Sequence, residues 1–223
     1  MVLSLGYESV LWDAGARVVV GIDEVGRGAL AGPVSVGLVA VARCEAWPDG
    51  LADSKQLTAR AREALIAPLS RFGVGRAVGH ASAAEIDQVG IIGALRLAGV
   101  RGLAALAGEG IVADAVLLDG THDWLTAPPA DLFADAAAGE ETTPPVTMVV
   151  KGDGLCASIA AASVIAKVER DAIMRAAHVD HPHFGWDGNK GYGAAAHLDA
   201  IREHGPSPWH RVSWKLPERE PSS

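Results

Sequence analysis

The chain has 223 residues, of which 49% are hydrophobic and 21% charged, and these values are ordinary for a globular protein with an apolar core. Only two cysteines occur, far apart at positions 44 and 156, which excludes a disulfide framework or a zinc cluster and favours a reducing cytoplasm. No unbroken apolar run approaches the roughly 18 residues that span a bilayer, so we expect no membrane association. One domain is expected over residues 1–215, followed by a disordered tail at 216–223.

The formal net charge of -8 argues against a protein that binds nucleic acid, because phosphate binding usually requires a basic surface. Five acids and no lysine or arginine lie in the Pro- and Ala-rich segment 121–145, and without them the charge would be -3 instead of -8. This segment lacks periodicity, so we expect a surface insertion there. Acids in a nuclease site are also neutralised by bound cations. The net charge therefore does not exclude a nuclease.

Three strand-like segments precede residue 82. The β-branched run at 16–22 ends at two acids and nearby glycines, and further strands are expected at 34–42 and 71–81, with a helix at 58–69 between them. Ser82 and Glu85 have the spacing of a capping box, which predicts a short helix before a longer apolar helix at 91–107.

The second half of the chain alternates strands with helices. Strands are expected at 115–118 and 146–150, followed by a long Ala-rich helix at 155–178 and a last helix at 194–203. A chain that begins with several strands and then alternates strands with helices is expected to form an α/β fold with a mixed central β-sheet flanked by α-helices.

Three apolar runs each end in an acid, and these acids are Asp23, Asp119 and Asp153. If the strands are neighbours in one sheet, their ends bring the carboxylates together at one edge. Such oxygen ligands suit Mg²⁺ or Mn²⁺. A turn is a sufficient reason for any one aspartate followed by glycine, but three at once favour a metal site.

Glu24 directly follows Asp23, and neighbouring residues of a regular strand point to opposite faces. Joint metal binding therefore requires a bend of the backbone, for which Gly26 and Gly28 supply freedom. An exposed glutamate at a strand end is the alternative. The segment 26–31 also fits the loose dinucleotide pattern, but Pro33 and a strand follow it instead of a helix. We interpret Gly26-Arg27-Gly28 as a loop that lets a sugar approach, with Arg27 available for a phosphate.

Six motifs occur in a fixed order over residues 18–214. They are GIDEVGRG at 21–28, DSKQL at 53–57, LDG at 118–120, KGD at 151–153, AAASVIAK at 160–167 and KGY at 190–192. Together they resemble type 2 ribonuclease H, ribonuclease HII. The resemblance implies an RNase H-like fold and a metal-binding, catalytic quartet of Asp23, Glu24, Asp119 and Asp153, which holds two Mg²⁺ or Mn²⁺ ions.

The resemblance also implies an endonuclease, expected to be a monomer, whose partners are RNA–DNA hybrids and duplex DNA containing ribonucleotides. It implies cleavage 5′ of the ribonucleotide, leaving a 3′-hydroxyl and a 5′-phosphate. Gly26, Arg27 and Gly28 are then expected to contact the ribose 2′-hydroxyl, and Tyr192 to pack on the sugar next to the cut.

Four lysines are further candidates for phosphate contacts, although each is as well explained as a solvated surface side chain. They are Lys55, Lys151, Lys167 and Lys190. The pair His210-Arg211 is another candidate contact. The chain departs from the resemblance in two places: Asn189 replaces a histidine that usually precedes KGY, and the gap between Asp119 and Asp153 is long.

Two alternatives share some of these features. Another RNase H-like nuclease, such as a junction resolvase, needs the acids but has no use for a ribose-reading loop. A nucleic-acid-binding module with this fold binds without metal-dependent cutting, and the full set of four acids argues against it.

Overall fold

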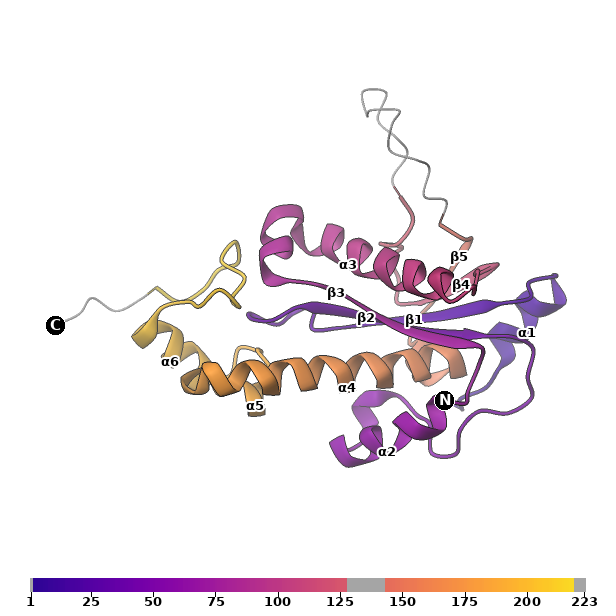
Figure 1. Ribbon diagram of the computed structural model, residues 1–223, viewed down its shortest axis with the longest axis horizontal. Helices are drawn as coiled ribbons and strands as arrows, with labels where there is room; N and C mark the ends of the chain where they lie inside the picture. Colours follow the sequence, from indigo (N-terminus) through magenta and orange to yellow (C-terminus); the bar gives the residue numbers. More distant parts are fainter. Residues whose placement is uncertain (1, 128–142, 219–223) are drawn as a thin grey trace, which may run out of the picture.

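The computed structural model describes residues 2–127 and 143–218. Its centre is a five-stranded sheet in the order β3-β2-β1-β4-β5 (Figure 1). The first three strands, β1 (Val19–Val25), β2 (Val34–Val41) and β3 (Gly75–Ala81), are antiparallel neighbours, whereas β4 (Ala115–Asp119) runs parallel to β1 and β5 (Val146–Val149) runs parallel to β4. The predicted mixed sheet is therefore present.

Helices cover both faces of this sheet (Figure 1). One face carries α3 (Ala83–Gly108), and the other carries α4 (Ala157–Asp180), with α2 (Ala59–Leu69) packed against α4. The shorter helices are α1 (Gly6–Asp13), α5 (Trp186–Asn189) and α6 (Ala195–His204), and single 3₁₀ turns lie at Ser54–Gln56, Gly152–Gly154 and Pro182–Phe184. Neither α1 nor α5 is predicted from the sequence.

The predicted capping box begins α3. The Ser82 hydroxyl accepts from the Glu85 backbone N–H at 3.2 Å, and the Glu85 carboxylate accepts from the Ser82 N–H at 2.8 Å. Gly90 interrupts the helix with a φ of 71°. The two helices expected here are therefore the two arms of one kinked helix.

Side chains of the strands alternate between two cores. In β1, Val20 and Ile22 belong to the core beneath α3, whereas Val19 belongs to the core beneath α4. In β4, Leu118 faces the α3 side and Leu117 the α4 side. Because the side-chain period of a strand is two, Asp23 and Asp119 fall on the α4 side of the sheet.

Helix α4 lies unusually close to the sheet. A Cβ atom added at Gly21 would lie 2.4 Å from the backbone carbon of Ser158, and one added at Gly37 would lie 2.2 Å from the carbonyl oxygen of Ala162. The facing half of α4, Ala157–Ala166, is buried along its whole length and is rich in alanine. Small residues on both sides thus permit the close approach.

A buried carboxylate fixes the beginning of α4. Glu8, on α1, is fully buried and accepts from the Ser158 backbone N–H at 2.9 Å and from its hydroxyl at 2.7 Å. A negative charge is favourable at the amino end of a helix. The unpredicted helix α1 therefore positions the element that faces the predicted acids.

Within the described residues, α3 is the one helix that is long and apolar enough, by length and composition, to cross a membrane. Arg96 and Arg101 interrupt the apolar residues of this helix, so it contains no unbroken apolar run of that length. Leu95, Ala98 and Leu106 on this helix are buried against β2 and β3 in the core, an arrangement typical of a core helix.

The expected insertion and tail are only partly described. Trp124 and Leu125 are 3% and 0% exposed and pack in the α3-side core, so the surface insertion does not begin at residue 121. Leu216, the first residue of the expected tail, packs against the buried cluster that includes Phe184, Trp186 and Ile201. The tail expected at 216–223 is therefore attached to the core at its beginning. Residues 128–142 and 219–223 lie outside the described part of the chain.

We predict that Gly37→Ala destabilises the protein, because its Cβ meets the Ala162 carbonyl at 2.2 Å. Overpacking of this kind costs about 1–3 kcal/mol, measured by chemical unfolding. Gly108→Ala is the matched control, because its Cβ meets nothing within 4 Å, and it should leave stability unchanged or raise it slightly. Equal stabilities of the two variants would contradict a tight interface between α4 and the sheet.

Candidate active site

Three carboxylates meet at one edge of the sheet. Asp23 lies on β1, Asp119 ends β4, and Asp153 lies in the turn Gly152–Gly154 that precedes α4. One carboxylate oxygen from each lies within 4.8 Å of the others. Asp23 and Asp153 are buried and Asp119 is half-buried. The convergence predicted from the three strand ends is thus present.

This arrangement is electrostatically unfavourable without a cation. Burial raises the pKa of Asp23 to about 8, the Ser163 hydroxyl opposes this rise, and the charges of Asp119, Glu24 and Asp153 add to it. Burial and the Asp153 charge also raise the pKa of Asp119, although its carboxylate accepts from the Gly152 backbone N–H at 2.7 Å. Like charges packed this closely favour the binding of divalent cations.

Lys55 partly compensates this negative charge. Its ammonium donates to Asp153 Oδ2 at 2.8 Å, and this hydrogen bond raises the pKa of Lys55. The Asp53 carboxylate accepts from the Lys55 backbone N–H at 2.8 Å and so forms the turn Ser54–Gln56. The DSK motif is therefore a capped turn that directs a lysine toward the carboxylates.

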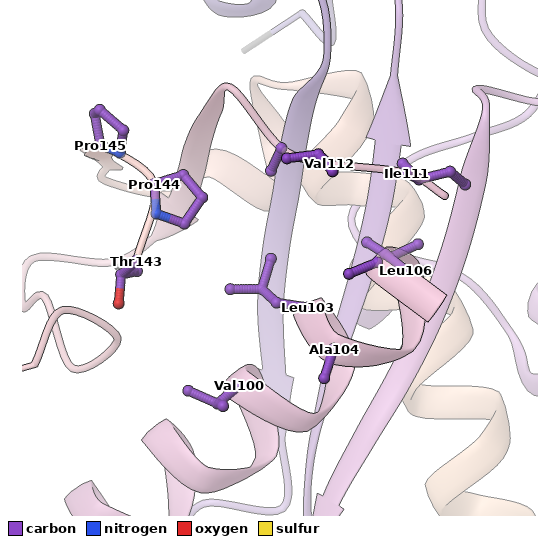
Figure 2. A pocket seen from close by; sticks show the side chains of 11 residues that line it. Val100, Leu103, Ala104, Leu106, Ile111, Val112, Thr143, Pro144 and Pro145 are labelled. Atoms are coloured by element: carbon purple, nitrogen blue, oxygen red, sulfur yellow. The ribbon is translucent and has the colours of Figure 1, made fainter. Parts of the chain in front are cut away.

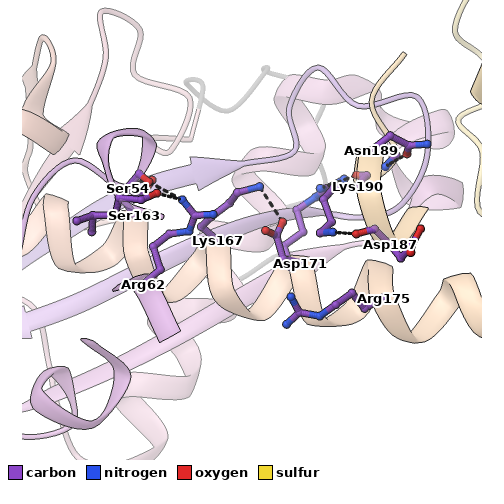
Figure 3. A network of polar contacts seen from close by, with 12 residues as sticks. Ser54, Arg62, Ser163, Lys167, Asp171, Arg175, Asp187, Asn189 and Lys190 are labelled. Atoms are coloured by element: carbon purple, nitrogen blue, oxygen red, sulfur yellow. Dashed lines mark hydrogen bonds and ion pairs between the residues drawn. The ribbon is translucent and has the colours of Figure 1, made fainter. Parts of the chain in front are cut away.

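Three contributors to the site are not predicted from the sequence: Ser54, Arg62 and Ser163. The hydroxyls of Ser54 and Ser163 lie 2.7 Å apart, and Arg62 donates to the Ser54 carbonyl at 2.7 Å (Figure 3). Ser54 and Ser163 stand inside the quoted motifs, which is the only signal for them in the sequence. They join the 54–56 turn to α4 beside Asp23.

Glu24 does not join the group of three carboxylates. The bend expected between Asp23 and Glu24 is absent, because β1 continues to Val25 in register with Ser35 of β2. The Glu24 carboxylate lies 3.5 Å from the Arg27 guanidinium and lines the same cleft as Asp23 and Asp119. Burial raises the pKa of Glu24, and the nearby Asp119 charge adds to this effect.

A cleft of about 440 Å³ lies over the carboxylates. It contains most of the predicted substrate residues, and its lining is Asp23, Glu24, Val25, Gly26, Arg27, Gly28, Ser54, Lys55, Arg62, Asp119, Ser163, Lys167 and Tyr192. Lys151 and Lys190 do not line it. Asp153, whose carboxylate belongs to the group of three, does not line it either, so the predicted site residues fall into one cleft with these three exceptions.

Lys151 and Lys190 both adopt left-handed backbone conformations, with φ of 58° and 52°. Lys151 is exposed at the turn that carries Asp153. The Lys190 ammonium donates to the Asp187 carbonyl, whereas the Lys167 ammonium, inside the cleft, donates to Asp171 at 2.7 Å (Figure 3). In this structure Lys151 and Lys190 shape turns.

Tyr192 stands at the rim of the cleft with 38% of its surface exposed, so it is not a core tyrosine. The buried guanidinium of Arg170 lies 5.6 Å from the centre of its ring. Asn189 supports the same segment, because its side chain donates to the Phe184 carbonyl at 2.7 Å and accepts from the Gly191 N–H at 2.8 Å. The unusual asparagine therefore holds the turn before Tyr192.

His210 and Arg211 are 2% and 0% exposed, so the expectation that they contact phosphate is wrong. His210 belongs to a buried hydrogen-bonded chain that reaches the backbone of Tyr192. His197 Nδ1 donates to the Tyr192 carbonyl at 2.8 Å, and His197 Nε2 accepts from Trp186 at 3.1 Å and lies 3.0 Å from His210 Nε2. Because Ser207 N–H donates to His210 Nδ1 at 2.9 Å, His210 Nε2 carries the proton shared with His197.

A larger hollow of about 520 Å³ lies elsewhere, on the α3 side of the sheet (Figure 2). Its lining includes Leu103, Ile111 and Pro144, and none of its lining residues is ionisable. It offers no group for hydrolysis. The polar cleft over the carboxylates is therefore the candidate active site.

The family model for ribonuclease HII matches residues 20–217. The chain belongs to the ribonuclease HII family. A ribonuclease HII of Streptomyces avermitilis is 46% identical over 200 residues, which cover 90% of this chain and 78% of that protein. None of the comparisons favours the junction resolvase or the non-catalytic module.

Solved structures show the same fold. The ribonuclease HII of Archaeoglobus fulgidus, in complex with PCNA, has a TM-score of 0.67 at 24% identity and covers 91% of this chain and 98% of its own. The ribonuclease HIII named Bst-RNase HIII, in complex with Mn²⁺, has a TM-score of 0.63 at 22% identity. The match covers 90% of this chain and 68% of that chain. The RNase H-like fold expected from the motifs is confirmed, and membership in this family makes the protein a metal-dependent endoribonuclease of the RNase H type.

The buried histidines predict a pH dependence of stability. Burial, followed by the neighbouring His197, lowers the pKa of His210 to about 4 from 6.5. Between pH 4 and 6.5 the unfolded chain binds more protons than the folded one, so stability is full above pH 6.5 and falls as the pH drops toward 4. His210→Gln should flatten this slope in unfolding measured from pH 4 to 7, and an unchanged slope would contradict the assignment.

Proposed function

We propose that this protein cuts the RNA strand of RNA–DNA hybrids and cleaves 5′ of single ribonucleotides in duplex DNA, leaving a 3′-hydroxyl and a 5′-phosphate. The observation that carries the proposal is the group of three carboxylates, with oxygens within 4.8 Å of one another, beside a glycine loop in one cleft. The loop directly follows β1, which carries Asp23 and Glu24, so a sugar held by the loop places its phosphate near the acids.

The donor set fits two Mg²⁺ or Mn²⁺ ions. Asp23, Asp119 and Asp153 offer hard oxygen ligands in a place where burial and like charges disfavour three free carboxylates, and Glu24 lines the same cleft. The fold is shared with a ribonuclease HIII in complex with Mn²⁺. When bound, such ions activate a water and stabilise charge on the leaving oxygen.

The chain's own cations bind and orient the substrate in this proposal. Lys55 and Lys167 both line the cleft and carry charges for the phosphates. Arg27 is exposed beside Glu24 and contacts the phosphate near the ribonucleotide. The exposed ring of Tyr192 packs on the deoxyribose next to the cut and so favours an RNA-to-DNA junction.

We also propose that the protein acts in the cytoplasm as a monomer, with RNA–DNA hybrids and ribonucleotide-containing DNA as its partners. Both cysteines are free thiols, as a reducing compartment requires. Burial and nearby acids raise the pKa of Cys156, which keeps this thiol unreactive.

Asp119→Asn tests the metal assignment. The isostere keeps the shape but loses the charge, so we expect cleavage of a duplex with one ribonucleotide to fall about a hundredfold or more, beyond the 10–100-fold typical of residues that only orient metal ligands. Mg²⁺ or Mn²⁺ should raise the melting temperature of the parent protein but not of the variant. Asp49→Asn, at an exposed position, is the control. A folded Asp119→Asn protein with normal turnover would refute the assignment.

Gly28→Ala tests the loop. Its added Cβ meets no protein atom within 4 Å, so stability should be retained or rise by about 0.4–1 kcal/mol. The methyl group instead enters the space of the ribose, and a displacement of about 1 Å already costs a factor near 100 in rate. We expect cleavage to fall about 10–100-fold while Gly108→Ala stays active. A fully active Gly28→Ala enzyme would exclude close contact between the loop and the sugar.

A further inference from the structure

Arg211 is a buried cation that has no acidic partner among the described residues. Its side chain is 0% exposed, and it takes part in none of the ion pairs between the residues that the structure describes. It lies 4.8 Å from the centre of the Trp214 ring. Burial, followed by the charge of Arg170, lowers its pKa to about 10. Such a group is costly to bury unless its hydrogen bonds are satisfied.

Backbone carbonyls of the glycine loop satisfy this guanidinium. Arg211 Nη2 donates to the Gly26 carbonyl at 2.7 Å and to the Gly32 carbonyl at 3.1 Å, and Nη1 donates to the Arg27 carbonyl at 2.9 Å. Its Nε donates to the Gly32 carbonyl at 3.3 Å. One side chain thus binds both ends of the segment 26–32.

These contacts determine where the neighbouring N–H groups point. A trans peptide is planar, so its C=O and N–H point in opposite directions, and the described chain has no cis peptide. With the Gly26 and Arg27 carbonyls turned inward to Arg211, the N–H groups of Arg27 and Gly28 are directed away from the core. Neither N–H has an acceptor among the described protein atoms, and both residues line the cleft.

Glycine occurs at positions 26 and 28 for different structural reasons. Gly26 has a φ of 84°, and an added Cβ would lie 2.0 Å from Arg170 Nε, so packing on the inner side requires glycine. Gly28 has open space where its Cβ would be. The loop is therefore fixed on its inner side by buried arginines and bare on the side that faces the cleft.

We propose that Arg211 is a positioning residue for ribose recognition, because it turns the N–H groups of Arg27 and Gly28 toward the cleft, where they donate to the 2′-hydroxyl oxygen of the ribonucleotide. This inference rests on the proposed function. Two adjacent N–H groups form a small concave donor site for such an oxygen. The preference for ribose over deoxyribose then depends on a side chain that never contacts the substrate.

Arg211→Lys keeps the charge but not the fork of five donors that binds three carbonyls. In an Asp119→Asn background, which prevents cutting, the readout is the ratio of Kd values for an all-DNA duplex and the same duplex with one ribonucleotide. We expect a ratio above one in the parent, and a reduction toward one by Arg211→Lys, with a change of about tenfold corresponding to one lost hydrogen bond.

Leu106→Ala is the control for a general loss of stability, because Leu106 is a core residue on α3 with 1% exposure. It should lower the melting temperature and leave the Kd ratio unchanged. An unchanged ratio in Arg211→Lys, or an equal change in Leu106→Ala, would overturn the inference. A different result would refute the proposed function: the protein without substitutions would not cut the ribonucleotide duplex in Mg²⁺ or Mn²⁺.

A second measurement needs no substitution at position 211. Amide resonances of Arg27 and Gly28, recorded by NMR for the Asp119→Asn protein, should shift on adding the ribonucleotide duplex and shift less on adding the all-DNA duplex. Identical shifts with both duplexes would overturn the inference even if Arg211→Lys fails to fold.

Discussion

The close approach of α4 to the sheet is the constraint on which the rest of the structure depends. Gly21 and Gly37 leave no room for a side chain beneath Ser158 and Ala162, and the facing half of the helix is buried. Because the helix lies so near, Ser163 reaches Asp23, and the turn before the helix places Asp153 beside Asp119. A larger interface residue would move the carboxylates apart before it affected any of them directly.

The group of three aspartates was predictable because it depends only on the alternation of side chains along a strand and on where the strands end. Asp23 and Asp119 directly follow the last parallel pair, Ile22 and Leu118, and the predicted sheet brings them to one edge. Glu24 was harder to place. Continued antiparallel pairing with β2 keeps β1 straight past Asp23, and pairing of this kind is a tertiary property that the glycines at 26 and 28 do not reveal.

The roles of the charged residues away from the acids were predicted less well, because the type of a residue does not reveal whether its side chain is buried. Arg211 was assigned to phosphate from its charge, yet it is enclosed and binds carbonyls. Lys190 serves its own turn by donating to Asp187. In both cases backbone acceptors created by the fold compete with the substrate, and their positions depend on contacts between segments up to 185 residues apart.

Buried charges of both signs surround the cleft, but they do not neutralise one another. The carboxylates of Asp23 and Asp153 lie on the sheet side, and Arg170 and Arg211 lie behind the glycine loop, where they bind carbonyls instead of acids. Direct pairing would satisfy both sets and would leave nothing for a ligand. Their separation leaves one wall that attracts cations and another that presents N–H donors to an oxygen. A sugar with its phosphate on a metal ion complements both walls at once, whereas a metal ion or a free oligonucleotide alone complements only one.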